Sequence, residues 1–153
     1  IVLDEKGYEY DVLGNAVHAF LAADVEGLTL EDRVERARRL LAGAGLTGVV
    51  RPESLVRAGD QLRAWVDAKW PGAVWHREVP IDASVPSADG DRRVSGIIDL
   101  LLETPSGCVI VDHKTFPGTS EAAVHAKAKE FLAQMVAYAT VLERYRARTV
   151  RGV

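Results

Sequence analysis

Residues 96–115 read GIIDLLLETPSGCVIVDHKT, and this stretch decides how the chain is expected to fold. Two apolar runs, 94–102 and 108–114, lie on either side of residues 104–107, Thr-Pro-Ser-Gly, which are typical of a turn. We therefore predict two strands joined as an antiparallel hairpin. A third strand is predicted just before them, at residues 74–83, where apolar and polar residues alternate loosely.

Three charged residues lie inside these apolar runs: Asp99, Asp112 and Lys114. If residues 104–107 form the loop, the register places Asp99 opposite Asp112, with Cβ atoms about 5 Å apart. Strand alternation then adds Lys114 to the same face. Two carboxylates held together among apolar side chains are unfavourable unless they share a proton or a cation. Oxygen ligands of this kind suit Mg²⁺ or Mn²⁺. The alternative is that Asp112 and Lys114 are solvated residues near a strand end and that Asp99 lies on an open face of the sheet.

The remaining elements are predicted from helical periodicity and from capping and turn residues. The expected order is a helical part over about 8–70, then a sheet with a long helix over about 73–148. We expect four helices: one over 8–26, a second from an N-cap at Thr29 to Gly43 or Gly45, a third from Pro52 to just before Pro71, and a fourth over about 120–146. Two loops are also expected, a polar one at 84–93 and another at 116–121. This order predicts an α/β or α+β fold in a single domain spanning residues 1–153.

Composition excludes several classes of protein. A net charge of −3 excludes a wholly basic surface for nucleic acid. The single cysteine, Cys108, excludes an internal disulfide and an iron–sulfur cluster held by cysteines alone, and we expect it in the core. No apolar run is long enough to cross a membrane, so we expect no membrane partner. The single cysteine makes a reducing, cytoplasmic setting the default expectation. The arginines at 33, 36, 38 and 39 are expected to form a solvated helix face.

Four motifs occur in a fixed order along the chain: LGNAVH at 13–18, GIID at 96–99, VDHKT at 111–115 and Gln134-x-x-x-Tyr138. This set resembles the PD-(D/E)XK nuclease superfamily, and more narrowly the RecB-like nuclease domain of bacterial helicase–nucleases. The resemblance implies a restriction-endonuclease-like core, in which helices flank a small mixed sheet with a central antiparallel hairpin. It also implies that the chain is the C-terminal part of a larger helicase–nuclease.

The resemblance implies a role for each matching residue. His18, Asp99 and Asp112, with the backbone carbonyl of His113, would bind one or two Mg²⁺ or Mn²⁺ ions, and Lys114 would be the catalytic lysine. The supporting residues would be Gln134 and Tyr138, with Glu78 as a further acidic candidate. Each outlying residue also has a structural explanation. A lone histidine such as His18 beside an apolar stripe is more often a packed core residue, and core packing alone explains the spacing of Tyr138.

The implied activity is a metal-dependent deoxyribonuclease, an exonuclease with a potential endonuclease activity, that cleaves single-stranded DNA in recombination and repair. The alternatives are an inactive nuclease-like module that binds DNA or scaffolds a helicase complex, and a metal-binding domain without nuclease activity. There is no GxxxxGK[ST] phosphate loop, so a helicase motor would lie outside these residues. No strand is predicted after the Gln134–Tyr138 helix, so the sheet is expected to be incomplete or closed by another segment.

Overall fold

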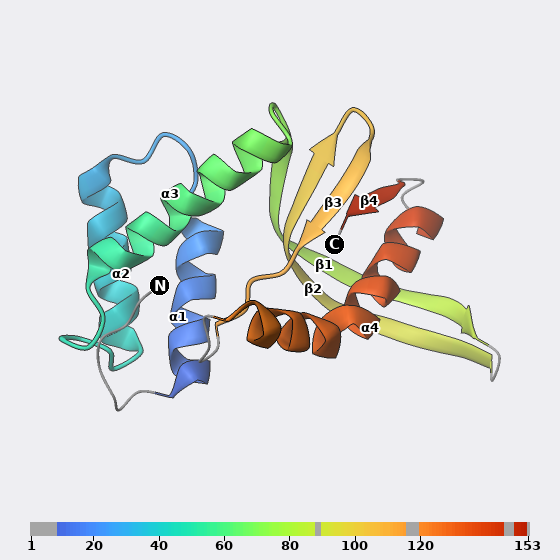
Figure 1. Ribbon diagram of the computed structural model, residues 1–153, viewed down its shortest axis with the longest axis horizontal. Coiled ribbons are helices and arrows are strands. Elements are labelled where there is room, and N and C mark those ends of the chain that lie inside the picture. Colours follow the sequence, from blue (N-terminus) through green and yellow to red (C-terminus); the bar gives the residue numbers. More distant parts are fainter. Residues whose placement is uncertain (1–8, 88–89, 116–119, 146–148, 153) are drawn as a thin grey trace. The chain divides into compact units, whose positions relative to one another are not determined.

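The computed structural model describes residues 9–87, 90–115, 120–145 and 149–152. Figure 1 shows the elements along the chain. In order they are α1 (Tyr10–Ala23), α2 (Leu30–Gly43), α3 (Pro52–Lys69), β1 (Val74–Ser87), β2 (Gly90–Thr104), β3 (Gly107–Val111), α4 (Glu121–Tyr145) and β4 (Val150–Gly152). They form two compact units. The helical unit is 1–71 with 113–117, and the sheet unit is 72–112 with 118–153.

The helical unit contains α1, α2 and α3, close to the predicted boundaries. Thr29 caps α2 as predicted, because its hydroxyl oxygen accepts a hydrogen bond from the Asp32 amide at 3.1 Å. Pro52 begins α3, a position where the backbone N–H that proline lacks would have no partner within the helix. One apolar face of each helix fills a common core, whose largest fully buried side chains are Leu13, Phe20, Leu41 and Leu55.

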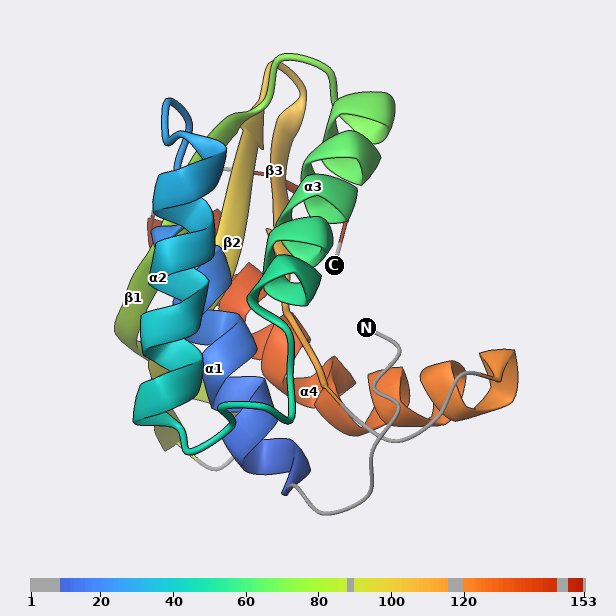
Figure 2. The ribbon, with the colours of Figure 1, turned by 90° about the vertical axis from the view of Figure 1, so that its left-hand side faces the viewer.

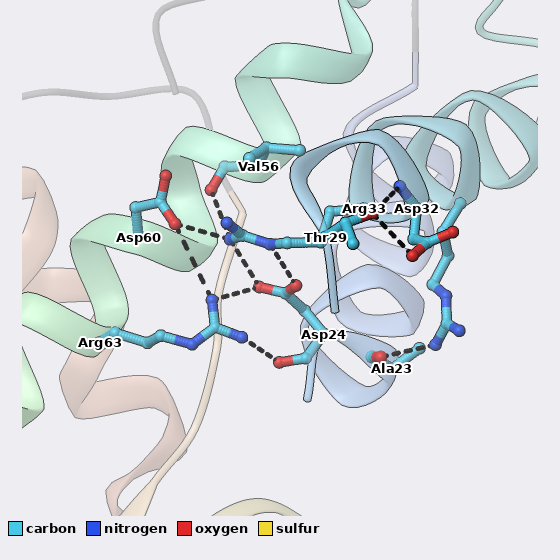
Figure 3. Close-up of polar contacts among 9 residues, drawn as sticks. Ala23, Asp24, Thr29, Asp32, Arg33, Val56, Asp60 and Arg63 are labelled. Atoms are coloured by element: carbon cyan, nitrogen blue, oxygen red, sulfur yellow. Dashed lines mark hydrogen bonds and ion pairs between the residues drawn. The ribbon is translucent and has the colours of Figure 1, made fainter. Parts of the chain in front are cut away.

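A buried ion-pair network joins the three helices of this unit, as Figure 3 shows. Asp24, directly after α1, is 2% exposed and accepts hydrogen bonds from Arg33 Nε on α2 at 2.7 Å and Arg63 Nη1 on α3 at 2.7 Å. Nη2 of Arg33 also donates to Asp60 at 2.6 Å. Burial raises the pKa of Asp24, but the hydrogen bonds from Arg33 and Arg63 outweigh that effect. Its pKa therefore lies below the ordinary value.

The network corrects the expectation of a solvated arginine face on α2. Arg33 is mostly buried against Asp24, and Arg36 donates to the backbone carbonyl of Ala23 at 2.6 Å, near the end of α1. Arg38 and Arg39 do remain exposed. The prediction failed for two of the four arginines because a buried carboxylate and a helix-end carbonyl need donors.

The sheet unit contains a four-stranded sheet in the order β1-β2-β3-β4. The first two pairings are antiparallel, and β3 and β4 are parallel. The helix α4 connects these parallel strands, as a crossover between parallel strands requires. The mixed α/β fold class is therefore confirmed. The expectation that no strand follows the last helix is wrong, because residues 150–152 add a short strand to β3.

The hairpin β1–β2 is longer than predicted. The prediction of a polar loop at 84–93 is wrong for the residues described there, since β1 runs to Ser87 and β2 begins at Gly90. Residues 88–89 lie outside the described part of the chain. So do residues 116–119 of the loop predicted at 116–121. Ala83, Val85 and Val94 alternate with polar residues and pack against the core of this unit, which explains the extra strand length. β1 is an edge strand, so it tolerates Pro80 and Pro86.

The β2–β3 hairpin has the predicted register. Glu103 pairs with Cys108 and Leu100 with Val111, while Pro105 and Ser106 form the turn. Cys108 is buried, as expected. However, β3 ends at Val111 rather than at Lys114. Strand alternation therefore does not place Lys114 on the face of Asp99, and that prediction is wrong, because the strand ends before Lys114.

Candidate active site

Three carboxylates occupy neighbouring positions across the sheet unit. The β1–β2 pairs Arg77–Leu100 and Val79–Ile98 leave Glu78 and Asp99 at the positions between them. The β2–β3 ladder ends at Leu100–Val111, so the next position on each side holds Asp99 and Asp112. We call Glu78, Asp99 and Asp112 the carboxylate row. Asp99 and Asp112 are partly buried, and Glu78 is exposed.

The backbone is irregular at this row. Glu78 has φ of 52°, in the left-handed region that non-glycine residues seldom adopt. The regular side-chain alternation is also interrupted there. Ile98 and Leu101 of β2 belong to the same core, although residues three apart in a regular strand point to opposite faces. Figure 1 shows both strands bending along their length. Irregularities of this kind often occur next to active sites, where they redirect side chains.

Gln134 and Tyr138 lie one turn apart on α4, as their spacing predicts. Gln134 Nε2 donates a hydrogen bond to the hydroxyl oxygen of Tyr138 at 2.8 Å. Tyr138 is buried in the sheet-unit core, and its hydroxyl lies directly against Gly96 on β2. The structural explanation for Tyr138 therefore holds. In addition, its hydroxyl links Gln134 to the strand that carries Asp99.

The other motif residues belong to the helical unit. His18 on α1 is partly buried, and its ring packs edge-to-face against that of His113, with ring centroids 5.8 Å apart. Gly14, one turn earlier on α1, lies beside Thr115. Lys114 is exposed. Figure 2 shows α1 among the other helices of this unit. The contact between His18 and His113 gives the His113 side chain a role that the sequence did not indicate.

The predicted residues are divided between the two units. One set contains the carboxylate row with Gln134 and Tyr138, and the other contains His18, His113 and Lys114. Among the described residues, no three His, Cys, Asp or Glu side chains are grouped closely enough to bind a metal ion. Neither the strained backbone of Glu78 nor the contact of Gly96 with Tyr138 was predicted from the sequence. The contact of Gly96 with Tyr138 did have a signal in the sequence, because a glycine within an apolar strand often marks a place where another group approaches the backbone closely.

The donor atoms of the carboxylate row fit a hard divalent cation. Each side chain offers carboxylate oxygens, which are the ligands that Mg²⁺ and Mn²⁺ favour. The chemistry that matches such a site is stabilisation of charge on a phosphate and activation of water.

Comparison with known protein families supports this chemistry. The family model of the PD-(D/E)XK nuclease superfamily matches residues 3–152. No curated protein matches the chain. Within the described part of the chain, no helix has the length and apolar character needed to span a membrane.

Proposed function

Since the chain belongs to the PD-(D/E)XK nuclease superfamily, we propose that it is a divalent-metal-dependent deoxyribonuclease whose metal site includes the carboxylate row. Nucleases of this superfamily hydrolyse phosphodiester bonds with divalent metal ions. The observation that carries the proposal is that Glu78, Asp99 and Asp112 each lie next to a paired position of the sheet, with Glu78 in strained backbone. A bound divalent cation would offset the repulsion between carboxylates drawn together around it.

We propose His18 as an imidazole ligand and the His113 carbonyl as a further oxygen ligand, alongside Asp99 and Asp112. When bound, Mg²⁺ or Mn²⁺ lowers the pKa of a coordinated water and offsets charge on the phosphate. The edge-to-face contact between His18 and His113 restrains the imidazole and so lowers the entropy lost on metal binding. Glu78 is the remaining candidate ligand, one position from Asp99 across the sheet.

The roles proposed for the other motif residues follow from their chemistry. Lys114 carries an exposed ammonium group, which suits it to orient the attacking water or to offset charge that develops on the phosphoryl oxygens. Gln134 and Tyr138 are positioning residues, because their hydrogen bond and the contact of Tyr138 with Gly96 restrain the strand that carries Asp99. The Gln134 amide is exposed and is available to meet the DNA backbone.

The cellular context is proposed from the motif set. The order of His18, Asp99, Asp112-His113-Lys114 and Gln134-x-x-x-Tyr138 resembles RecB-like nuclease domains. We therefore propose that the domain degrades single-stranded DNA, mainly as an exonuclease, and that a helicase motor supplies the strand during recombination or repair. A reducing, cytoplasmic setting belongs to the same proposal, in keeping with a single, buried cysteine, Cys108.

The test is DNA degradation by the 153-residue chain with single- and double-stranded substrates, in Mg²⁺, Mn²⁺ or EDTA. Degradation should require a metal and should fall at least 100-fold in Asp112→Asn and Lys114→Gln proteins. The matched control is Asp82→Asn, which removes an exposed carboxylate of β1 that pairs with Arg93. Degradation that persists in EDTA or in Asp112→Asn would refute the proposal. Binding of DNA without degradation would support the inactive module instead.

A further inference from the structure

All three tryptophans of the chain occur within residues 65–75, and each has a cationic side chain over its ring. In the helical unit, Lys69 Nζ lies 5.1 Å from the ring centroid of Trp65 and 5.9 Å from that of Trp70. In the sheet unit, the guanidinium carbon of Arg77 lies 4.7 Å from the ring centroid of Trp75. We call Trp65, Lys69 and Trp70, at the end of α3, the tryptophan platform.

Core packing does not explain the tryptophan platform. Trp65 is 40% exposed, and among the residues that the structure describes, neither Trp65 nor Trp70 is part of the hydrophobic core of the helical unit. The two rings instead contact one another, with centroids 5.1 Å apart and an interplanar angle of 84°. Trp70 therefore restrains Trp65 from the side while part of the Trp65 ring remains open to solvent. Large aromatic side chains held in this way on a surface are typical of recognition sites.

The chemistry of the platform selects its ligand. An exposed indole offers a flat surface on which a nucleobase can stack, and the neighbouring ammonium group can pair with a phosphate. Bases in a duplex are already stacked on one another, so this combination favours unpaired strands. The chain has a net charge of −3, which disfavours binding to duplex phosphates by charge alone.

We propose that the tryptophan platform binds single-stranded DNA, with Trp65 stacked on a base and Lys69 beside the adjacent phosphate. The choice of DNA rests on the proposed function, but the platform is separate from the residues assigned to cleavage. It would hold a strand through contacts that do not depend on base sequence, since every base presents a flat face. Such binding suits an enzyme that degrades a strand along its length.

The experiment measures binding of the 153-residue chain to a labelled oligothymidylate of about 15 nucleotides, in EDTA so that metal-dependent cleavage is absent. Fluorescence anisotropy reports binding, and quenching of tryptophan fluorescence reports stacking. Trp65→Ala should weaken binding by about 5- to 100-fold, whereas Trp65→Phe should retain most of the affinity. Lys69→Gln should reduce the slope of log affinity against log salt by about 0.7, the change expected for one lost phosphate contact on a single strand. The control is Arg39→Gln, which removes an exposed cation of α2 that pairs with Glu35. It should leave the affinity and the salt slope unchanged.

Unchanged binding in Trp65→Ala, or equal affinity for duplex and single strands, would overturn the inference. Circular dichroism establishes that each variant is folded, and if Trp65→Ala is not folded, Lys69→Gln and Trp65→Phe still decide the question. Failure of the nuclease proposal is distinguishable from failure of this one. A chain that binds oligothymidylate through Trp65 but cleaves no DNA would refute only the former. Metal-dependent cleavage with no effect of Trp65→Ala on binding would refute only the latter.

Discussion

The hydroxyl of Tyr138 lies so close to Gly96 that a Cβ atom at residue 96 would be 2.0 Å from the hydroxyl oxygen. Glycine is therefore required in β2 where α4 crosses it. The contact fixes the helix that carries Gln134 to the strand that carries Asp99, three residues further on. It joins the last motif of the chain to the first carboxylate of the hairpin through packing alone.

Gly96→Ala should destabilise the protein by about 2–3 kcal/mol, because the added methyl group overpacks the core against Tyr138. Tyr138→Phe in the same chain should recover part of that loss, since the next atom of the ring would still be 2.9 Å from the new Cβ. Urea unfolding of the single and double variants measures both. Gly43→Ala is the matched control, because nothing lies within 4 Å of its Cβ position and it should be neutral or slightly stabilising. Equal effects at residues 43 and 96 would contradict the assigned contact.

Asp24→Asn should lower the free energy of unfolding by about 2–3 kcal/mol. The substitution leaves Arg33 and Arg63 without their shared carboxylate in a partly buried site. Glu35→Gln is the control, because Glu35 pairs with two exposed arginines on α2 and exposed pairs contribute little. Chemical unfolding at pH 7 measures the difference. A loss as small as that of Glu35→Gln would show that the network is not stabilising.

The pH dependence of stability should follow the lowered pKa of Asp24. A carboxyl group with a folded-state pKa below its unfolded value of about 3.9 binds fewer protons when folded. Its stabilising effect is therefore fully present above pH 3.9 and is lost as the pH falls through the folded pKa. Unfolding titrations between pH 7 and pH 3 should show a shallower acid-side decline for Asp24→Asn than for the wild type. Parallel curves of unfolding free energy against pH for the two proteins would contradict the lowered pKa of Asp24.

Glu78→Gly should raise the free energy of unfolding by about 1 kcal/mol in the absence of metal, because glycine adopts a φ of 52° without strain. Glu78→Gln keeps the strain and should leave this stability close to that of the wild type. If Glu78 is a ligand, both variants should lose part of the stabilisation by Mn²⁺. Thermal unfolding with and without the metal separates the two effects. A Gly variant less stable than the Gln variant would contradict the strain.

Mn²⁺ should raise the melting temperature of the wild type, because it binds the folded state. At ten times its Kd the gain should be about 1.4 kcal/mol, or about 3–6 °C. Asp99→Asn and Asp112→Asn should remove most of that gain, whereas Asp82→Asn should keep it. A calorimetric titration provides a second readout that requires no DNA. An equal gain in all four proteins would show that the metal binds elsewhere.

The helices, the register of the β2–β3 hairpin and the family were predictable without coordinates, because they depend on periodicity, capping residues and motif order. Thr29, Pro52 and the pairing of Glu103 with Cys108 are local features of this kind. Tertiary structure decided the rest. It gave Glu78 a strained backbone, set Tyr138 against Gly96, ended β3 at Val111 and buried Arg33 against Asp24. Each of these depends on groups far apart in the chain, whose packing and desolvation override local preference. Spacing along a sequence carries no measure of those energies.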